Sequence, residues 1–164
     1  MRSTLLRIRA RGRLTVGSGV EIGRRARVRV SPRARVTIAE GTRIGERLTI
    51  EAVAGHVRIG PYAWLGDGVR VLARADVTIA ERCVLHDGAT LLTSLPAHAD
   101  PDAPAARRAP YTAAVTLEAG ARLRERAAVE PGVTVAAGAE VGAREVAGSA
   151  PRPGPQTAAP SRSA

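Results

Sequence analysis

Histidine is the side chain in this sequence best suited to proton transfer, and the chain has three: His56, His86 and His98. A neutral imidazole can take a proton from a hydroxyl group near pH 7, and such a general base typically contributes roughly 10²–10⁴ in rate. His98 begins an HADP segment inside a stretch rich in Pro and Ala. It is either a catalytic base or an ordinary surface-loop histidine.

His86 follows an aliphatic residue in the segment LHDG. It either lines a groove between subunits or is a solvated corner residue. His56 lies beside Gly55, and a structural or solvated role is favoured there. The three histidines lack metal-ligand spacing, so we predict no metal.

Three further side chains could contribute to binding or packing. Cys83 is the only cysteine, so no disulfide can form within the chain and no multi-cysteine metal site is possible. Its place two residues before Leu85 favours a small core residue. Tyr62 and Trp64 flank a predicted corner, where they seal a subunit interface, cap the outer face, or form a stacking platform for an acceptor or an adenine ring.

A six-residue repeat positions all of these side chains. A tripeptide such as Val-Thr-Ile alternates in, out, in, as a strand requires, and a period of six does not hold one face of an α-helix. Gly or Ala often follows the inward residue, and we expect Gly there to supply the backbone angles of a corner. Three such sides complete one coil, and coils stack about 4.8 Å apart. The residues predicted to face inward are Val16, Ile22, Val28, Ile38, Ile44, Ile50, Ile59, Leu65, Val71, Ile79, Leu85, Leu91, Leu117, Leu123, Val129, Val135 and Val141.

The period is interrupted in four places, the last of which is a long loop. Long loops of this kind are usually functional or disordered. The Pro-, Ala- and Ser-rich C-terminus cannot bury a core and should be a disordered tail. The interruptions fall at residues 31–32, 51–55, 72–78 and 93–114. We therefore predict one β-helix domain over residues 1–146, with a protruding loop at 93–114, and a tail over 147–164.

Composition limits the core and the partners. Aromatic residues make up only 2% of the chain, which predicts a narrow core of small and branched side chains. The net charge is +10 and every basic residue is Arg, which fits either a GC-rich genome or attraction to a polyanion or phosphorylated ligand. No apolar run is long enough for a signal peptide or a membrane span, so we expect a cytoplasmic protein without membrane contact.

The stretches VTIAEGTRIG, VRIGPYAWLGDGVRV and VEPGVTVAAGAEVG resemble the hexapeptide-repeat acyltransferases over residues 14–146, with greatest similarity to the sugar and antibiotic O-acetyltransferases. The resemblance implies an all-β fold, a single-stranded left-handed parallel β-helix; the repeat spacing by itself does not give the handedness. It also implies a homotrimer with acetyl-CoA as co-substrate and a small-molecule hydroxyl acceptor.

The resemblance carries residues over as well. His98, followed by Asp100-Pro101, matches the catalytic histidine of the family's projecting loop, and His86 is the fallback. Gly142 and Ala143 match a coil where the family uses backbone groups to hold the pantetheine of acetyl-CoA. The chain departs from the family at residues 122–126, where RLRER stands in the coil that commonly has Gly.

Three functions therefore compete. The first is an acyl-CoA-dependent O-acyltransferase acting on a sugar or a related small molecule. The second is a catalytically decayed trimeric β-helix that serves as a scaffold or binding protein. The third is an anion-binding surface, since Arg crowds the first coils; nucleic acid is not favoured, because aromatic residues for base stacking are not interleaved with the arginines.

Overall fold

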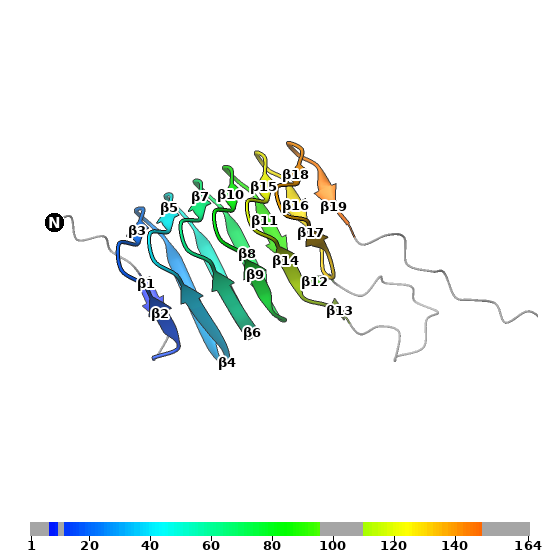
Figure 1. Cartoon of the computed structure of the whole chain (residues 1–164). Helices are drawn as coiled ribbons and strands as arrows, with labels where there is room; N and C mark the ends of the chain where they lie inside the picture. The colour runs from blue at the N-terminus through cyan, green and yellow to red at the C-terminus, as the bar shows by residue number, and fades with distance from the viewer. Residues whose placement is uncertain (1–6, 10–11, 96–109, 149–164) are drawn as a thin grey trace, which may run out of the picture.

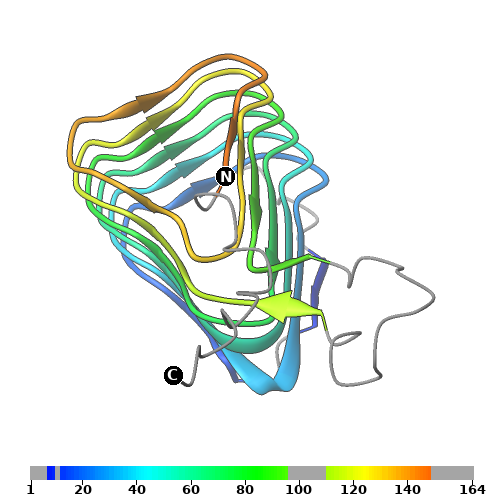
Figure 2. The same cartoon turned by 90° about the vertical axis from the view of Figure 1, so that its right-hand side faces the viewer.

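The computed structural model describes residues 7–9, 12–95 and 110–148, and all regular secondary structure in these ranges is β-strand. The chain winds into a parallel β-solenoid of about six coils (Figure 1). Viewed along the axis, the coils superimpose as a triangle with three sides and three corners (Figure 2). A search of the described residues for a helix long and apolar enough to cross a membrane finds none.

Corresponding strands of successive coils pair in parallel, so each side of the triangle is a ladder. The first side contains β2 (Leu14–Val16), the ends of β4 (Arg27–Ile38) and β6 (Thr49–Ile59), β9 (Val77–Ile79), β14 (Val115–Leu117) and β17 (Thr134–Val135). The second side contains β3 (Glu21–Ile22), β5 (Arg43–Ile44), β7 (Trp64–Leu65), β10 (Val84–Leu85), β15 (Arg122–Leu123) and β18 (Glu140–Val141). The third side contains β1 (Arg7–Arg9), the starts of β4 and β6, β8 (Arg70–Ala73), β11 (Thr90–Leu92), β16 (Ala128–Val129) and β19 (Val146–Ala147). A separate antiparallel pair joins β12 (Ser94–Leu95) to β13 (Tyr111–Thr112).

The core is the narrow column that the repeat predicts. From Val28 to Val141, every residue predicted to face inward is buried, and the described aromatic residues lie outside the column. The two predicted inward residues before Val28 are exceptions: Ile22 is only partly buried, and Val16 is 43% exposed. Its strand, β2, pairs only with β4 among the described strands, so no further strand covers Val16 at that end of the helix.

At the corners, the residue with positive φ is not the one that the sequence predicted. Positive φ occurs three positions after the inward residue, for example at Gly41 (φ 64°) and Arg47 (φ 56°), and not at the Gly directly after it. The Gly directly after the inward residue serves close packing between coils. A Cβ on Gly60, for instance, would lie 2.6 Å from the backbone carbon of Ala80 in the next coil.

Two of the four interruptions of the six-residue period form continuous strand. Residues 31–32 lie inside β4 and residues 51–55 inside β6, so each strand runs over the corner between the third and first sides. The two segments pair with each other from Arg27↔Thr49 to Ile38↔Ile59, with one register shift between Val30 and Arg33. Because adjacent coils both carry extra residues at this corner, the extra backbone groups find partners in the neighbouring coil and remain in the ladder.

Candidate functional sites at two corners of the helix

The long loop leaves the helix at the corner between the third and first sides (Figure 2). Its base is fixed by the β12–β13 pair, with Ser94 opposite Thr112 and Leu95 opposite Tyr111. Thr93, which is fully buried, anchors it further: its hydroxyl oxygen accepts hydrogen bonds from the amides of Arg74 (2.6 Å) and Ala75 (3.1 Å). His98, together with residues 96–109 as a whole, lies outside the described residues.

An open depression of about 530 Å³ lies beside the base of the loop. Its walls combine apolar side chains with one carboxylate and one guanidinium. They are formed by Glu51, Val53, Leu72, Ala73, Arg74, Leu92, Ser94 and Pro110. The depression is therefore a place where a small polar molecule with an apolar part could lie against the loop.

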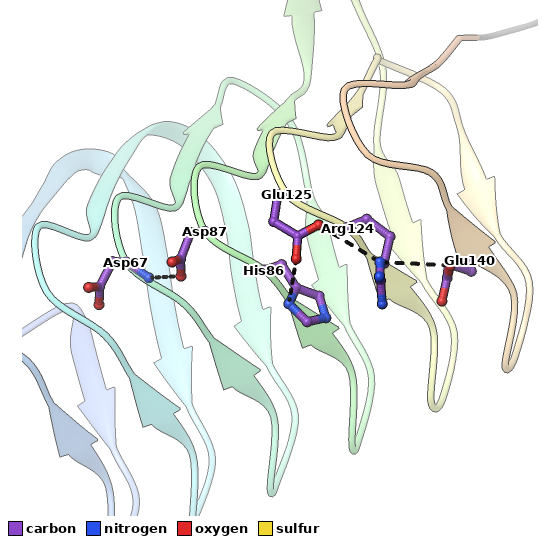
Figure 3. A network of polar contacts seen from close by, with 6 residues as sticks. All are labelled: Asp67, His86, Asp87, Arg124, Glu125 and Glu140. Carbon is purple, nitrogen blue, oxygen red and sulfur yellow. Dashed lines mark hydrogen bonds and ion pairs between the residues drawn. The ribbon is translucent and has the colours of Figure 1, made fainter.

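The corner between the second and third sides holds His86 (Figure 3). Nδ1 of His86 lies 3.5 Å from Oε1 of Glu125 in the next coil, and its ring meets the ring of Trp64 edge to face, with centroids 5.5 Å apart. Nδ1 therefore faces a carboxylate from the adjacent coil. In acyl-transfer enzymes a carboxylate orients the histidine base through a hydrogen bond; the contact here is longer and has ion-pair distance.

Glu125 is itself held as an anion. Its own backbone N–H lowers the pKa of its carboxyl group, and Arg124 and His86 lower it further. Nε of Arg124 lies 3.8 Å from Glu125 and 4.0 Å from Glu140, so the arginine links two successive coils (Figure 3). A carboxylate that stays ionised can hold a protonated imidazole during proton transfer.

Two aspartates extend this corner towards the N-terminal coils. The carboxylate of Asp87 accepts a hydrogen bond from the amide of Asp67 (2.8 Å; Figure 3), and that of Asp67 accepts one from the amide of Glu46 (2.7 Å). Gly45 and Gly66 leave room for these carboxylates, since a Cβ on either would collide with them. The aspartates thus satisfy corner amides, which gives them a structural function.

Gly142 and Ala143 lie at this same corner. Leu85, Leu123 and Val141 are in register, so the residues after them, His86, Arg124 and Gly142, occupy one column in successive coils. His86 and Gly142 are therefore two coils, or about 10 Å, apart. Both backbone groups of Gly142 already bond to Glu145: its N–H donates to the carboxylate (2.6 Å) and its carbonyl accepts from the amide (3.1 Å). A ligand that binds this backbone must first displace Glu145.

His56 and Cys83 have structural surroundings. Nε2 of His56 lies 2.8 Å from the Thr37 hydroxyl, and its pKa is lowered by partial burial and then by the nearby Arg58 and Arg35, against the effect of Asp76. Cys83 is fully buried, as expected for a core residue, and burial raises the pKa of its thiol. Neither residue has the setting of a nucleophile or a base.

The aromatic pair lies on the outer face of the second side. Tyr62 is 59% and Trp64 40% exposed, and both border a shallow depression that includes Gly41 and Arg43. Tyr62 adopts positive φ (56°) at a corner, and its ring covers Gly41, where a Cβ would touch it. The sequence indicated the exposed corner but not the contact between Trp64 and His86, which needs the stacking of β7 on β10.

The loop base and the His86 corner stand at opposite ends of the third side. From Ala89 to Thr93, this side runs through β11 (Thr90–Leu92) and spans roughly 13 Å at strand rise. Within one chain, His86 therefore lies away from the base of the loop. Among the described residues, no three His, Cys, Asp or Glu side chains are placed to hold a metal ion.

The whole chain was compared with known proteins. No protein-family model matches it, and no curated protein matches it in sequence. Solved structures do match in fold. One is the N-acyltransferase AntD from Bacillus cereus, in complex with dTDP and coenzyme A, with a TM-score of 0.56 and 14% identity over 80% of this chain and 72% of that one.

A second match is a hexapeptide-repeat acetyltransferase from Vibrio cholerae O1 biovar eltor, complexed with acetyl coenzyme A. Its TM-score is 0.51 with 18% identity, and the aligned part is 79% of this chain but only 60% of that one. These likenesses confirm the predicted fold, the left-handed parallel β-helix. The usual right-handed rule for crossovers depends on strand twist, and here most strands are only two or three residues long.

Proposed function

We propose that the protein is an acyl-CoA-dependent acyltransferase that acylates a hydroxyl group of a sugar or related small molecule. The observation that carries the proposal is the fold, a parallel β-helix like those of the matched acyltransferase structures with bound coenzyme A or acetyl coenzyme A. The His86–Glu125 contact, in the same corner column as Gly142, adds a second candidate base to His98. The matched structures support it, since AntD is an N-acyltransferase in complex with coenzyme A and dTDP. Because AntD acylates nitrogen, an amine is the acceptor to test beside a hydroxyl.

In the proposed reaction, a histidine Nε2 removes the proton from the acceptor hydroxyl as its oxygen attacks the thioester carbonyl carbon. The tetrahedral intermediate collapses, the C–S bond breaks, and the coenzyme A thiolate takes the proton back from the imidazolium. His98 is the proposed base, because its loop matches the histidine-bearing loop of the acyltransferases; His86 is the second candidate. Acetyl-CoA is the proposed co-substrate, bound along the column of Gly142 and Ala143, and the reaction uses no metal.

We also propose that the enzyme is a homotrimer. His86 and the loop base lie at different corners, so one chain by itself does not join the two candidate sites. Packing three β-helices around a three-fold axis would bring the loop base of one subunit beside the His86 corner of a neighbour. Closed symmetry is also the usual solution for oligomers. Light scattering that gives a monomeric mass at micromolar concentration would contradict the trimer.

The decisive experiment is acetyl-CoA binding by calorimetry, followed by acetyl transfer in the His98→Ala and His86→Ala variants. If His98 is the base, His98→Ala lowers the transfer rate at least about a hundredfold and leaves acetyl-CoA affinity nearly unchanged. The same loss in His86→Ala, with His98→Ala unaffected, assigns the base to the corner. Arg70→Ala, at an exposed outward position, serves as a control for a general effect of surface truncation.

A decayed scaffold is the second candidate function. Two observations favour it: Glu145 already occupies the backbone groups of Gly142, and Arg124 stands in the column between His86 and Gly142. A wild-type protein that forms trimers but binds no acetyl-CoA would support the scaffold. Binding restored by Glu145→Ala would instead identify Glu145 as the obstacle and retain the acyltransferase.

A further inference from the structure

Positive charge is concentrated in the first coils. Residues 1–60 contain 14 Arg and 4 acidic residues, a net charge of +10, whereas residues 61–148 contain 9 Arg and 11 acidic residues, a net charge of −2. A bias in genome composition would act on the whole chain alike. The asymmetry therefore needs a cause that is local to the N-terminal coils.

Three arginines of this region surround one depression. Arg25, Arg27 and Arg47 are exposed, and with Thr49 they line an open hollow of about 320 Å³ at the corner between the second and third sides. β4 pairs in register with β6, which places Arg27 directly beside Thr49. Within the described part of the chain, no carboxylate comes within ion-pair distance of any of these three guanidinium groups.

Among the described residues near the hollow, Arg29 and Arg43 have an acidic partner, whereas Arg24, Arg33 and Arg35 have none within ion-pair distance. Arg29 lies 3.7 Å from Glu51, and Arg43 lies 3.5 Å from Glu21. Like charges placed one coil apart repel each other, by about 1 kcal/mol for a pair at 4 Å in water. The hollow therefore holds three cations that the described residues do not neutralise.

Two of the three arginines turn a corner of the helix. Arg25 (φ 58°) and Arg47 (φ 56°) both adopt the left-handed conformation, which is unfavourable for a residue with a Cβ. The same corner position is Gly68 and Gly88 in the next two coils, so the fold accepts glycine there at no steric cost. Arg126 and Arg144 adopt the same conformation in the C-terminal coils of this column, so the conformation belongs to the corner. Arg25 and Arg47 differ from them in sharing a hollow with Arg27 and Thr49.

We propose that Arg25, Arg27, Arg47 and Thr49 form a binding site for a diphosphate or longer polyphosphate group. The planar guanidinium donates paired hydrogen bonds to phosphate oxygens, and a threonine hydroxyl can donate one more. Three cations match a ligand with at least two phosphate groups better than a single anion. The site lies four coils, or about 19 Å, from the column position of Gly142, and it does not depend on acyl transfer.

The test compares two pairs of substitutions at equivalent corners. Arg25→Gly/Arg47→Gly removes two charges from the hollow, and Arg126→Gly/Arg144→Gly removes two charges from the same corner column in the C-terminal coils, where φ is 58° and 59°. Glycine accepts positive φ, so both variants should fold, and thermal unfolding checks this. Both lower the net charge by the same amount.

The probe is sodium tripolyphosphate, titrated by calorimetry at 0.15 M salt. We expect the wild-type protein to bind it, and the Arg25/Arg47 variant to bind at least about tenfold more weakly, since each charge-assisted hydrogen bond is worth a tenfold change or more. The Arg126/Arg144 variant should bind within about twofold of the wild type. Equal weakening in both variants, or no binding by the wild type, overturns the proposal.

Three further titrations identify the source of the phosphates. Pyrophosphate, ADP and acetyl-CoA are each compared between the two variants. A nucleoside diphosphate or acetyl-CoA that loses affinity only in the Arg25/Arg47 variant is assigned to the site as its ligand. A single-stranded oligonucleotide that binds while tripolyphosphate does not would overturn the site and indicate a general basic surface.

Discussion

The N-terminal and C-terminal halves of the β-helix share one core but differ in the net charge of their surfaces. Both halves place aliphatic residues at the same inward positions, and both turn their corners on a residue with positive φ. The N-terminal coils carry the long strands β4 and β6 and a strong excess of arginine over acidic residues. The C-terminal coils carry the base of the loop and the carboxylates that pair with His86 and Arg124.

This difference shows which positions of the repeat are fixed by packing and which are free to vary. Packing fixes the inward residue, the small residue near the corner and the residue with positive φ. The outward positions contact solvent, so they can vary in charge without affecting the fold. Features confined to one half, such as the unpaired arginines or the His86–Glu125 pair, are therefore not required by the repeat.

The largest effect is expected in the core, which the two halves share. Ile79→Asp should prevent cooperative folding, because Ile79 is fully buried and an unpaired buried carboxylate costs several kcal/mol. Arg70→Ala, on an exposed outward position, should change stability by about 0.5 kcal/mol or less. Thermal unfolding followed by circular dichroism measures both. A soluble Ile79→Asp variant with a cooperative transition would contradict the inward assignment.

Two glycines at the same corner should respond differently. Gly45→Ala should destabilise by roughly 2–3 kcal/mol, because its Cβ would meet backbone atoms of Gly66 and Asp67 at 2.7–2.8 Å. In Gly142→Ala the new Cβ meets only the carboxylate of Glu145, at 2.8 Å, and a side-chain tip can move away. Its cost should stay below about 0.5 kcal/mol. Equal losses in urea unfolding would show that stacking is no tighter at Gly45 than at Gly142.

The two buried threonines give a third comparison. Thr93→Val should cost roughly 1–2 kcal/mol, because the amides of Arg74 and Ala75 lose their acceptor at the loop base. Thr42 only donates, to the carbonyls of Ala39 and Gly60, so Thr42→Val should cost less. Urea unfolding of both variants gives the ranking. A larger loss for Thr42→Val would mean that the loop base is not anchored through Thr93.

The sequence predicted the inward column well, because burial depends directly on the six-residue period. It did not predict Arg25 or Arg47 at positive φ, since preference alone assigns such positions to glycine. Nor did it predict that β4 and β6 continue over their corner, which requires the extra residues of two coils to pair with each other. The contact of His86 with Glu125 joins residues 39 apart, and only the stacking register reveals it.

The smallest expected effect is the pH dependence contributed by His56 in the N-terminal half. Its pKa is lowered in the folded protein, chiefly by partial burial, so the unfolded chain binds a proton at a higher pH than the folded chain does. Above the unfolded value, near 6.5, both states are neutral and His56 has no effect on the free energy of unfolding. As the pH falls through the interval between the two pKa values, the unfolded state binds more protons and stability decreases; below the folded pKa the loss is complete.

Urea unfolding of the wild type and of His56→Gln between pH 7.5 and pH 5 measures this contribution. Glutamine does not titrate and can still reach the Thr37 hydroxyl, which lies 2.8 Å from Nε2 of His56. The wild type should therefore lose more stability than His56→Gln as the pH falls below about 6.5. Because Arg58 and Arg35 also lower the pKa of His56, Arg35→Ala should bring the folded and unfolded pKa values closer together. The free energy of unfolding should then fall less as the pH decreases. Parallel pH profiles for the wild type and His56→Gln would show that the arginines of the N-terminal coils do not influence His56, and would weaken the contrast in charge between the two halves.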